Sequence, residues 1–404
     1  MHKKKQILFV MNTLGRAGAE RALIELMRLL EPERYEVYLY VLVPRGEMFG
    51  QVPSHVRILN RKTDAGSVLS VGGKLAVAGR LGKAALHPAC LKKAVQRLSD
   101  AGKERTGEAA QRTEKILRRM LADGTPGIPH RFDLAVAYLE GPATWYVAEK
   151  IQAKKKVAFL HIDYRKAGYS RTLDQGCYET FDQIFAVSRD VRESFLSVYP
   201  EYAGKTSVFF NIINKEYIRK QSLLPGGFTD GYKGMRLLTV GRLYYQKGYD
   251  IAVKTAELLR KRGYEFRWYA LGEGEERANL HRQIRRAGLV DSFILLGASD
   301  NPYPYFRQAD IYVCTSRFEG KSIVIEEAQA LGKPVVATPC TGVAEQICPG
   351  TDGVIAGPDP GELADEIGKL IGDPLLRSRY GTAAAQKEMA WEQGYSCFLT
   401  LLQE

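Results

Sequence analysis

Two stretches of the 404-residue chain decide the fold: QILFVMNTLGRAGAERALIELMRLL at residues 6–30, and RLLTVGRLYYQKGYDIAVKTAELLRKR at residues 236–262. Each begins with a short apolar run and continues through a loop that contains glycine. Each ends in a segment whose apolar residues recur at helical spacing. A strand, a glycine loop and a helix in that order open a βαβ unit. The chain therefore starts the same kind of α/β fold twice.

Further short apolar runs follow both stretches. They lie at residues 36–43, 134–138, 156–160 and 183–187 in the first half, and at residues 266–271, 293–296, 311–314 and 334–338 in the second. Helical patterns separate these runs, which predicts parallel sheets. We expect an α/β protein with two Rossmann-like domains whose parallel sheets face each other across a cleft. Ligands in such folds bind beyond the carboxyl ends of the strands.

Glycine and proline mark the predicted domain boundaries. The segment RKQSLLPGGFTDGYKG, residues 219–234, reads as a linker between a first domain at 1–218 and a second domain at 235–385. Residues 386–404 carry apolar and aromatic side chains at helical spacing and predict a final helix.

The composition excludes several classes of protein. Hydrophobic residues make up 45% and charged residues 26%, which is ordinary for a globular chain. No apolar run approaches the ~18–20 residues of a membrane span, and the run Ile7–Met11 is too short for a secretory signal. The six cysteines show neither C-x-x-C spacing nor a histidine cluster. This favours reduced thiols in a cytoplasmic compartment over a disulfide framework or a zinc site.

The positive charge is concentrated in one segment. The net charge is +12, and Arg61–Arg119 holds 14 basic but only 5 acidic residues. Within it, residues 74–100 mix apolar and basic positions at helical spacing. The apolar line there is Leu91, Val95 and Leu98, and the basic residues off that line are Lys92, Lys93 and Arg97. A helix lying on an anionic membrane and an ordinary solvated helix face both remain open. No nucleic-acid-binding motif accompanies the charge, so no nucleic-acid partner is expected.

The densest chemistry lies in TSRFEGKSIVIEEAQALG, residues 315–332. Glu319 falls in the loop after a strand, and Glu327 falls just past the first turn of a helix that begins near Ser322. The amides near Gly320–Ile323 are expected to point outward at the helix N-terminus, which suits a phosphate or the polar edge of a sugar. A carboxylate accepts two hydrogen bonds from a vicinal diol, so Glu327 suits a ribose and Glu319 suits sugar hydroxyls.

One apparent motif in this segment is excluded. Gly320-Lys321-Ser322 looks like the end of a phosphate-binding P-loop. The first glycine of that motif would stand at position 315, which is Thr.

These residues resemble family 4 of the retaining glycosyltransferases, which have the GT-B fold. Glu319 and Glu327 form the E-x7-E signature of that family within SRFEGKSIVIEEAQALGKPVVAT. GRLYYQKG at 241–248 resembles its G-R-x(4)-K-G element, and LGEGEER at 271–277 resembles its L-G-x-G-x-x element. LGRAGAERAL at 14–23 is similar to its N-terminal loop, with alanine in place of the first glycine.

The resemblance implies a mechanism and a set of site residues. It implies metal-independent, retaining transfer from a nucleotide-sugar, with UDP favoured as the carrier and no cofactor. Arg242 and Lys247 would hold the diphosphate and offset the charge of the leaving group. His161 would hydrogen-bond the reacting sugar. The predicted catalytic residues are His161, Arg242, Lys247 and Glu319. The predicted donor-binding residues are Gly18, Gly241, Arg242, Lys247, Gly272, Gly274, Glu319, Gly320, Lys321, Ser322, Ile323 and Glu327.

The first domain, with its basic insertion at about 61–130, is expected to select the acceptor. Glu140 at a strand end is an acceptor-binding candidate or a helix cap, and Asp163 either binds the acceptor or orients His161. By resemblance, the acceptor is a glycan or a lipid-linked molecule in the synthesis of a bacterial capsule, other surface polysaccharide or glycolipid. The same resemblance implies peripheral attachment to the inner face of the plasma membrane through residues 74–119, and a final helix at 386–404 that crosses back to the first domain.

Two further residue assignments and three alternative functions complete the interpretation. Gly15 is expected to let its loop approach the diphosphate, and Glu345, in a stretch similar to the family's G-G-x-x-E turn, is either a helix cap or a ligand contact. The main alternative function is a non-catalytic glycosyltransferase-like subunit that binds sugar nucleotide or assists an active partner. A dinucleotide-dependent oxidoreductase is disfavoured because the first loop, NTLGRAGAE, lacks G-x-G-x-x-G. A GT-B phosphorylase would normally be longer.

Overall fold

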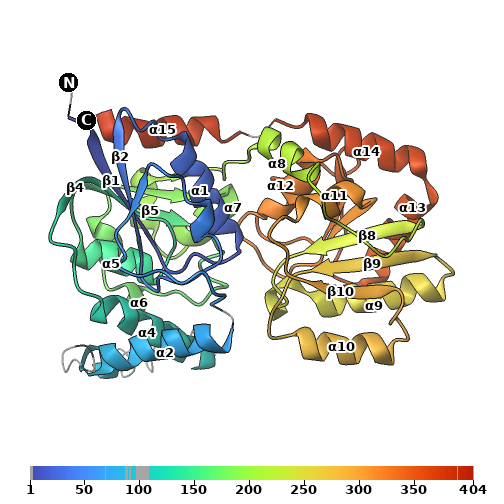
Figure 1. The fold of residues 1–404 in the computed structure, drawn as a ribbon, viewed down its shortest axis with the longest axis horizontal. Coiled ribbons are helices and arrows are strands. Elements are labelled where there is room, and N and C mark those ends of the chain that lie inside the picture. Colours follow the sequence, from blue (N-terminus) through green and yellow to red (C-terminus); the bar gives the residue numbers. More distant parts are fainter. Residues whose placement is uncertain are drawn as a thin grey trace. The chain divides into compact units, whose positions relative to one another are not determined.

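The computed structural model describes residues 3–68, 70–86, 90, 92–96, 109–388 and 390–403. The chain divides into two compact units (Figure 1). Unit 1 comprises residues 1–212 and 390–404, and unit 2 comprises residues 213–389.

Unit 1 contains a parallel sheet in the order β3-β2-β1-β4-β5-β6-β7. Its strands are β1 (Lys5–Met11), β2 (Tyr35–Val41), β3 (Val56–Ile58), β4 (Arg131–Ala137), β5 (Gln152–Leu160), β6 (Gln183–Ala186) and β7 (Thr206–Val208). Its helices are α1 (Gly18–Leu29), α2 (Val71–Ala85), α4 (Ala109–Gly124), α5 (Pro142–Lys150), α6 (Arg171–Asp174), α7 (Arg189–Leu196) and α15 (Glu392–Gln403), with short 3-10 turns η1 (Phe49–Gln51), η2 (Cys177–Thr180) and η3 (Pro200–Lys205).

The core of unit 1 explains why its strands are continuous apolar runs. Residues 7–11 of β1 are fully buried, as expected for a central strand of a parallel sheet that is covered on both faces. Phe398 of α15 is also fully buried, and its ring lies 6.3 Å from that of Phe9 and 6.4 Å from that of Phe209. The last helix therefore completes the core of unit 1, although the chain reaches it only after passing through unit 2.

Unit 2 contains a second parallel sheet, in the order β10-β9-β8-β11-β12-β13. Its strands are β8 (Met235–Val240), β9 (Phe266–Leu271), β10 (Phe293–Gly297), β11 (Ile311–Cys314), β12 (Val335–Ala337) and β13 (Gly353–Ile355). Its helices are α8 (Lys215–Ser222), α9 (Tyr249–Lys261), α10 (Arg277–Arg286), α11 (Tyr303–Gln308), α12 (Ile323–Ala330), α13 (Pro360–Gly372) and α14 (Pro374–Gln386), with the 3-10 turn η4 (Tyr245–Lys247).

Both sheets reverse their strand order at an equivalent point. In unit 1 the chain leaves β1 toward β2 on one side and returns to β4 on the other; in unit 2, β8, β9 and β11 repeat this pattern. The loops that follow the two strands at such a point run to opposite sides of the sheet, and the space between them is the usual ligand site of a doubly wound fold. The topology of unit 2 thus directs attention to the loops after β8 and β11.

The first boundary differs from the sequence-based one. Unit 2 begins at Ile213, and residues 219–234 pack within it instead of linking the units. The ring of Phe228 lies 4.1 Å from that of Tyr269, and Asp230 accepts a hydrogen bond from Arg267 at 2.7 Å. The glycines and the proline of this segment shape turns, but its apolar and charged side chains bind it to the sheet.

The basic insertion also differs in part from its sequence pattern. Residues 92–96 are helical, with Ala94 buried and Val95, expected on the apolar side, 59% exposed. Leu91, Arg97 and Leu98 lie outside the described residues. Within the part of the chain that the structure describes, no helix is both long and apolar enough to cross a membrane.

Candidate active site

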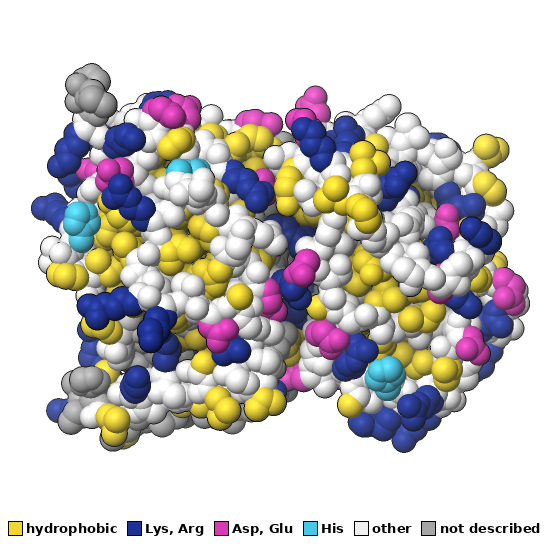
Figure 2. Space-filling model, viewed as in Figure 1, with side chains coloured by type: hydrophobic (Ala, Val, Ile, Leu, Met, Phe, Trp, Pro, Cys, Tyr) yellow, Lys and Arg dark blue, Asp and Glu magenta, His cyan; other side chains and the backbone are white. Residues whose placement is uncertain are grey.

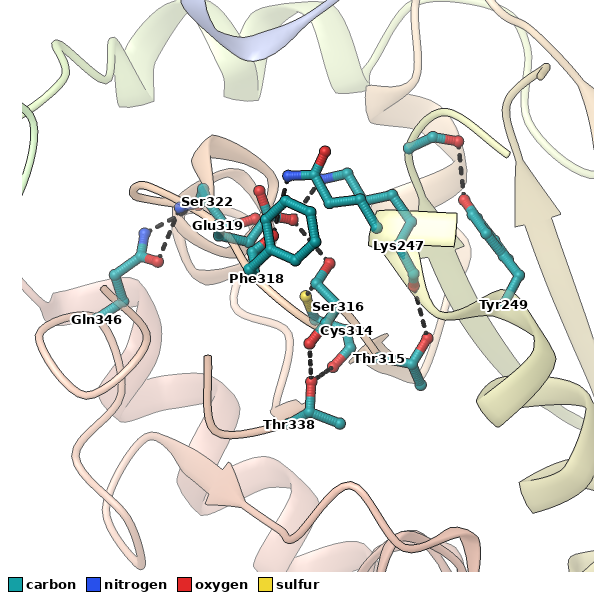
Figure 3. A network of polar contacts seen from close by, with 12 residues as sticks. Lys247, Tyr249, Cys314, Thr315, Ser316, Phe318, Glu319, Ser322, Thr338 and Gln346 are labelled. Carbon is teal, nitrogen blue, oxygen red and sulfur yellow. Dashed lines mark hydrogen bonds and ion pairs between the residues drawn. The ribbon is translucent and has the colours of Figure 1, made fainter. Parts of the chain in front are cut away.

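The candidate site in unit 2 is built from the two loops at the reversal of strand order. Residues 241–248 follow β8, and residues 315–322 follow β11 and lead into α12. At their base, the amide N–H of Arg317 donates to the carbonyl of Gln246 at 2.8 Å, and Gln246 Nε2 donates to the carbonyl of Phe318 at 2.9 Å. These hydrogen bonds join two loops that are far apart in the sequence (Figure 3).

An ion pair between Lys247 and Glu319 joins these loops. Lys247 Nζ contacts Glu319 Oε1, and the side chains are only 18% and 9% exposed. Ser316 Oγ donates a second hydrogen bond to Glu319 Oε1 at 2.7 Å (Figure 3). Both contacts fall on Oε1. The pair brings together two residues that the sequence analysis assigns to catalysis.

The charge of Lys247 is stabilised by its partner. Burial lowers the pKa of Lys247, but the charge and hydrogen bond of Glu319 outweigh that effect and raise the pKa above its ordinary value. Lys247 is therefore a cation throughout the neutral range. A low-exposure cation at this loop can stabilise negative charge more strongly than one in open water.

Glycines allow the loops to approach closely. Gly248 has φ 61°, and a Cβ there would lie 2.0 Å from the carbonyl oxygen of Thr315. A Cβ on Gly272 would lie 1.9 Å from the carbonyl oxygen of Gly241, and one on Gly274 would lie 2.3 Å from that of Leu243. Gly272 and Gly274, predicted to bind the donor, thus have a packing role: they seat the 271–276 turn against the loop after β8.

Arg242 and Lys247 occupy different environments in the same loop. The Arg242 side chain is exposed, and its guanidinium lies 5.2 Å from the centre of the Tyr244 ring. Lys247 lies instead at the base of the loop, against Glu319. The loop therefore presents one solvent-exposed cation, Arg242, and one ion-paired cation, Lys247, to any anion that binds there.

Glu327 lies inside α12 and is almost fully buried. Tyr303, at the start of α11, donates a hydrogen bond from its hydroxyl to Glu327 Oε1 at 3.0 Å. The sequence pattern identifies Glu327 but gives no indication of Tyr303, which is 24 residues away. Tyr303 orients the carboxylate that the sequence analysis assigns to a ribose diol.

The entry to α12 differs from the expectation of outward-pointing amides. Ser322 precedes Ile323, the first residue of the helix, but its N–H donates to Gln346 Oε1 at 3.0 Å. Lys321 is also buried, and its Nζ lies 2.5 Å from Glu326 Oε1. The Ser322 amide and the Lys321 ammonium, both predicted to bind the donor, are engaged within the protein. The physical reason is that burial of these groups requires partners.

Two predicted residues come together in unit 1. Glu140 is buried just beyond β4, and its Oε2 accepts the backbone N–H of His161, just beyond β5, at 2.8 Å. Burial raises the pKa of Glu140 and lowers that of His161 to about 3, so the imidazole is neutral at physiological pH. His161 Nε2 is buried without a hydrogen-bond partner among the described residues. A neutral imidazole at this position can donate or accept a hydrogen bond with a ligand, but it adds no positive charge to the site.

The other predicted residues of unit 1 are placed separately. Asp163 Oδ1 accepts hydrogen bonds from Ser194 Oγ at 2.6 Å and from the amide of Lys166 at 3.1 Å, which anchors its loop to α7. Gly18 is the exposed first residue of α1, and Gly15 lies in the loop between β1 and that helix. These contacts give Asp163 a structural role that its position in the sequence did not indicate.

The described architecture is the GT-B fold, with two parallel α/β sheets of the kind seen in known glycosyltransferases. The chain is similar over 98% of its length to Anabaena HepE, whose structure was solved in complex with UDP and glucose (TM-score 0.69, 19% identity, 99% of that chain). It is also similar over 99% of its length to sucrose-phosphate synthase from Thermosynechococcus elongatus (TM-score 0.67, 16% identity, 98% of that chain).

The sequence comparisons agree with the fold. Residues 232–387, which lie within unit 2, match the family model "Glycosyl transferases group 1". The chain is 32% identical over 152 residues to alpha-D-kanosaminyltransferase of Streptomyces kanamyceticus, and 33% identical over 156 residues to the amylovoran biosynthesis glycosyltransferase AmsD of Erwinia amylovora. The matches cover 37% and 38% of this chain and 39% and 43% of those proteins. The sequence similarity to glycosyltransferases thus lies in unit 2, and these matches span about two fifths of the relatives' length.

The imidazole of His161, whose Nε2 is buried, yields a prediction that needs no substrate. The nuclear magnetic resonance signals of His161, assigned by their loss in His161→Gln, should keep the values of a neutral ring from pH 7 down to about pH 4, because burial lowers its pKa to about 3. A pH titration of the ring carbons measures this. Protonation with a midpoint near 6.5, the ordinary value for histidine, would show that the ring is solvated and not held as described.

Proposed function

We propose that the protein is a retaining glycosyltransferase that moves a sugar from a UDP-sugar to an acceptor hydroxyl without a metal. The observation that carries this proposal is the low-exposure Lys247–Glu319 ion pair at the reversal of strand order, together with the buried Glu327 of α12, the helix that follows the Glu319 loop. UDP as the carrier is supported by the solved structures of HepE with UDP and glucose and with UDP-glucose.

We assign roles in donor binding to the two glutamates and the two cations of the site. Glu327, oriented by Tyr303, accepts hydrogen bonds from the ribose diol. Glu319 Oε1 is engaged by Lys247 and Ser316, so Oε2 is the oxygen we assign to the sugar hydroxyls. Arg242 folds onto the diphosphate from solvent, and Lys247 shares its charge between Glu319 and the phosphate oxygens.

The chemical step then depends on stabilisation of the leaving group. The acceptor hydroxyl attacks the anomeric carbon on the face from which UDP departs, and a phosphate oxygen of the donor takes the hydroxyl proton. The carbon–oxygen bond to the phosphate breaks, and its electrons remain on UDP. Arg242 and Lys247 stabilise that charge in place of a metal. His161, which is neutral, hydrogen-bonds the sugar and does not act as a cation.

We assign acceptor selection to unit 1, with Glu140 and Asp163 as the candidate acceptor-binding residues. A glycan or lipid-linked acceptor in the synthesis of a bacterial surface polysaccharide or glycolipid is supported by the similarity to AmsD, named for amylovoran biosynthesis. The basic segment would hold the protein on the inner face of the plasma membrane. In support, Val71 and Leu75 of α2 are 78% and 66% exposed, and Lys74 and Lys83 are exposed on the same helix. Figure 2 shows apolar and basic side chains interspersed along the edge of unit 1 where α2 lies.

Loss of the fixed cation should abolish most of the turnover. Lys247→Ala should lower kcat by ~10²-fold or more, the scale for the loss of one major charge stabiliser. Release of UDP from a panel of UDP-sugars, with and without acceptor extracts, measures it. Lys261→Ala, an exposed lysine on α9, is the control and should behave as the wild type. Wild-type turnover in folded Lys247→Ala would refute the assigned role.

Membrane attachment can be tested on vesicles. The protein should co-sediment with vesicles of phosphatidylglycerol and phosphatidylcholine, less so at high salt. Replacement of Lys74, Lys83, Lys92 and Lys93 by Glu should lower the partition coefficient by ~10²-fold or more, because each basic residue near an anionic surface contributes about 1 kcal/mol. Val71→Asp with Leu75→Asp should also weaken binding, whereas Leu375→Asp, an exposed leucine of α14, should not. Unchanged sedimentation in both sets would favour a solvated helix face.

A further inference from the structure

Gln346 occupies an unusual position relative to the candidate donor loop. It is 1% exposed, and its carboxamide faces the backbone of Ser322, which is 3% exposed (Figure 3). Gln346 Oε1 accepts the Ser322 N–H at 3.0 Å, and Gln346 Nε2 donates to the Ser322 carbonyl at 2.8 Å. One side chain therefore satisfies both polar groups of one buried peptide residue.

The place of Ser322 gives this contact a consequence for the site. Ser322 precedes α12, and its own side chain makes no capping hydrogen bond to that helix. Glu319 lies three residues before it and Glu327 five residues after it. A rotation of the Ser322 peptide would move the loop that holds Glu319 relative to the helix that holds Glu327. Such a rotation would break the two hydrogen bonds between the Ser322 backbone and the Gln346 carboxamide.

Gln346 is itself held from two directions. Its backbone carbonyl accepts hydrogen bonds from Gln329 Nε2 at 2.7 Å and from Lys387 Nζ at 2.6 Å. Lys387 Nζ also lies 2.7 Å from Asp352 Oδ2. Hydrogen bonds thus hold both the backbone carbonyl and the side-chain amide of Gln346. A residue held in this way constrains the conformation of a neighbouring loop more strongly than a surface residue can.

A second contact joins the same two segments. Gly342 has φ 79°, and a Cβ there would lie 2.2 Å from the carbonyl oxygen of Gly320. Residues 342 and 346 thus contact residues 320 and 322, respectively. The turn after β12 therefore packs against the segment that leads into α12. Within that turn, Gln346 makes the polar contacts to this segment.

We propose that Gln346 is a positioning residue for the donor. It sets the Ser322 backbone and, through it, the spacing of the sugar-binding Glu319 and the ribose-binding Glu327. This inference rests on the proposed function, because it assigns a donor to that loop. It adds a residue that neither the E-x7-E signature nor the G-G-x-x-E-like turn includes.

The test is the dissociation constant of UDP, measured by calorimetry. Gln346→Met keeps the approximate volume but removes both hydrogen bonds, and it should weaken UDP binding about tenfold or more. Two net hydrogen bonds of about 1 kcal/mol each set that scale. Gln346→Glu, which keeps the acceptor for the Ser322 N–H but loses the donor to its carbonyl, should weaken binding in the same direction and serves if the methionine variant does not fold.

The chain offers a matched control. Gln308 makes the same kind of bidentate contact elsewhere in unit 2: its Oε1 accepts the Phe228 N–H at 2.8 Å, and its Nε2 donates to the Gly226 carbonyl at 3.0 Å. Gln308→Met should accelerate hydrogen exchange of the Phe228 amide, and Gln346→Met that of the Ser322 amide. Only Gln346→Met should weaken UDP binding, and its effect should be non-additive with that of Glu327→Gln.

Three results have different meanings. Weakened UDP binding in Gln346→Met alone, with non-additivity, supports the proposal. Wild-type affinity in Gln346→Met, despite faster exchange at Ser322, overturns the positioning role and leaves the proposed function intact. Absence of UDP binding by the wild-type protein overturns the proposed function, and the assignment of Gln346 falls with it.

Discussion

The ion pair between Lys247 and Glu319 is the interaction on which the candidate site depends. Its partners come from the loops after β8 and β11, on either side of the reversal in strand order. Because both side chains have low exposure, removal of either would leave an uncompensated charge, which typically costs about 3–5 kcal/mol at buried sites. Neighbouring residues stabilise the pair. Ser316 donates a hydrogen bond to the Glu319 carboxylate, and Gly248, which has no side chain, lets the two loop backbones approach each other.

This arrangement places two cations in one loop, where a diphosphate could bind, and pairs the less exposed cation with a carboxylate. The positive charge of Lys247 is balanced by the carboxylate of Glu319, whereas the Arg242 side chain is exposed to solvent. Glu327 is fixed by Tyr303, and the loop between the two glutamates is fixed by Gln346. The site is therefore preorganised at its base. Such preorganisation reduces the cost of ordering the site when the donor binds.

The sequence predicted the strands that are largely buried, but not three short strands that are partly exposed. All ten predicted strands coincide with observed strands to within a few residues, because a central parallel strand is a continuous apolar run. Strands β3, β7 and β13 have three residues each and only one buried residue each, whereas the equally short β12 is buried throughout and was recognised as an apolar run. The motifs located Glu319, Glu327 and Lys247, whereas Tyr303 and Gln346 were missed because their partners lie 24 residues away in the sequence. Their roles arise from tertiary contacts, which have no local signature.

We infer that unit 2 binds the nucleotide of a sugar donor through Glu327. The most direct test is thermal stability with a panel of UDP-, GDP- and ADP-sugars, for the wild-type protein and for Glu327→Gln. A ligand at 100 times its Kd should stabilise the folded protein by about 2.7 kcal/mol. We expect a stabilising shift with UDP-sugars that is lost in Glu327→Gln. Absence of a shift with every sugar nucleotide, or an equal shift in the variant, would contradict it.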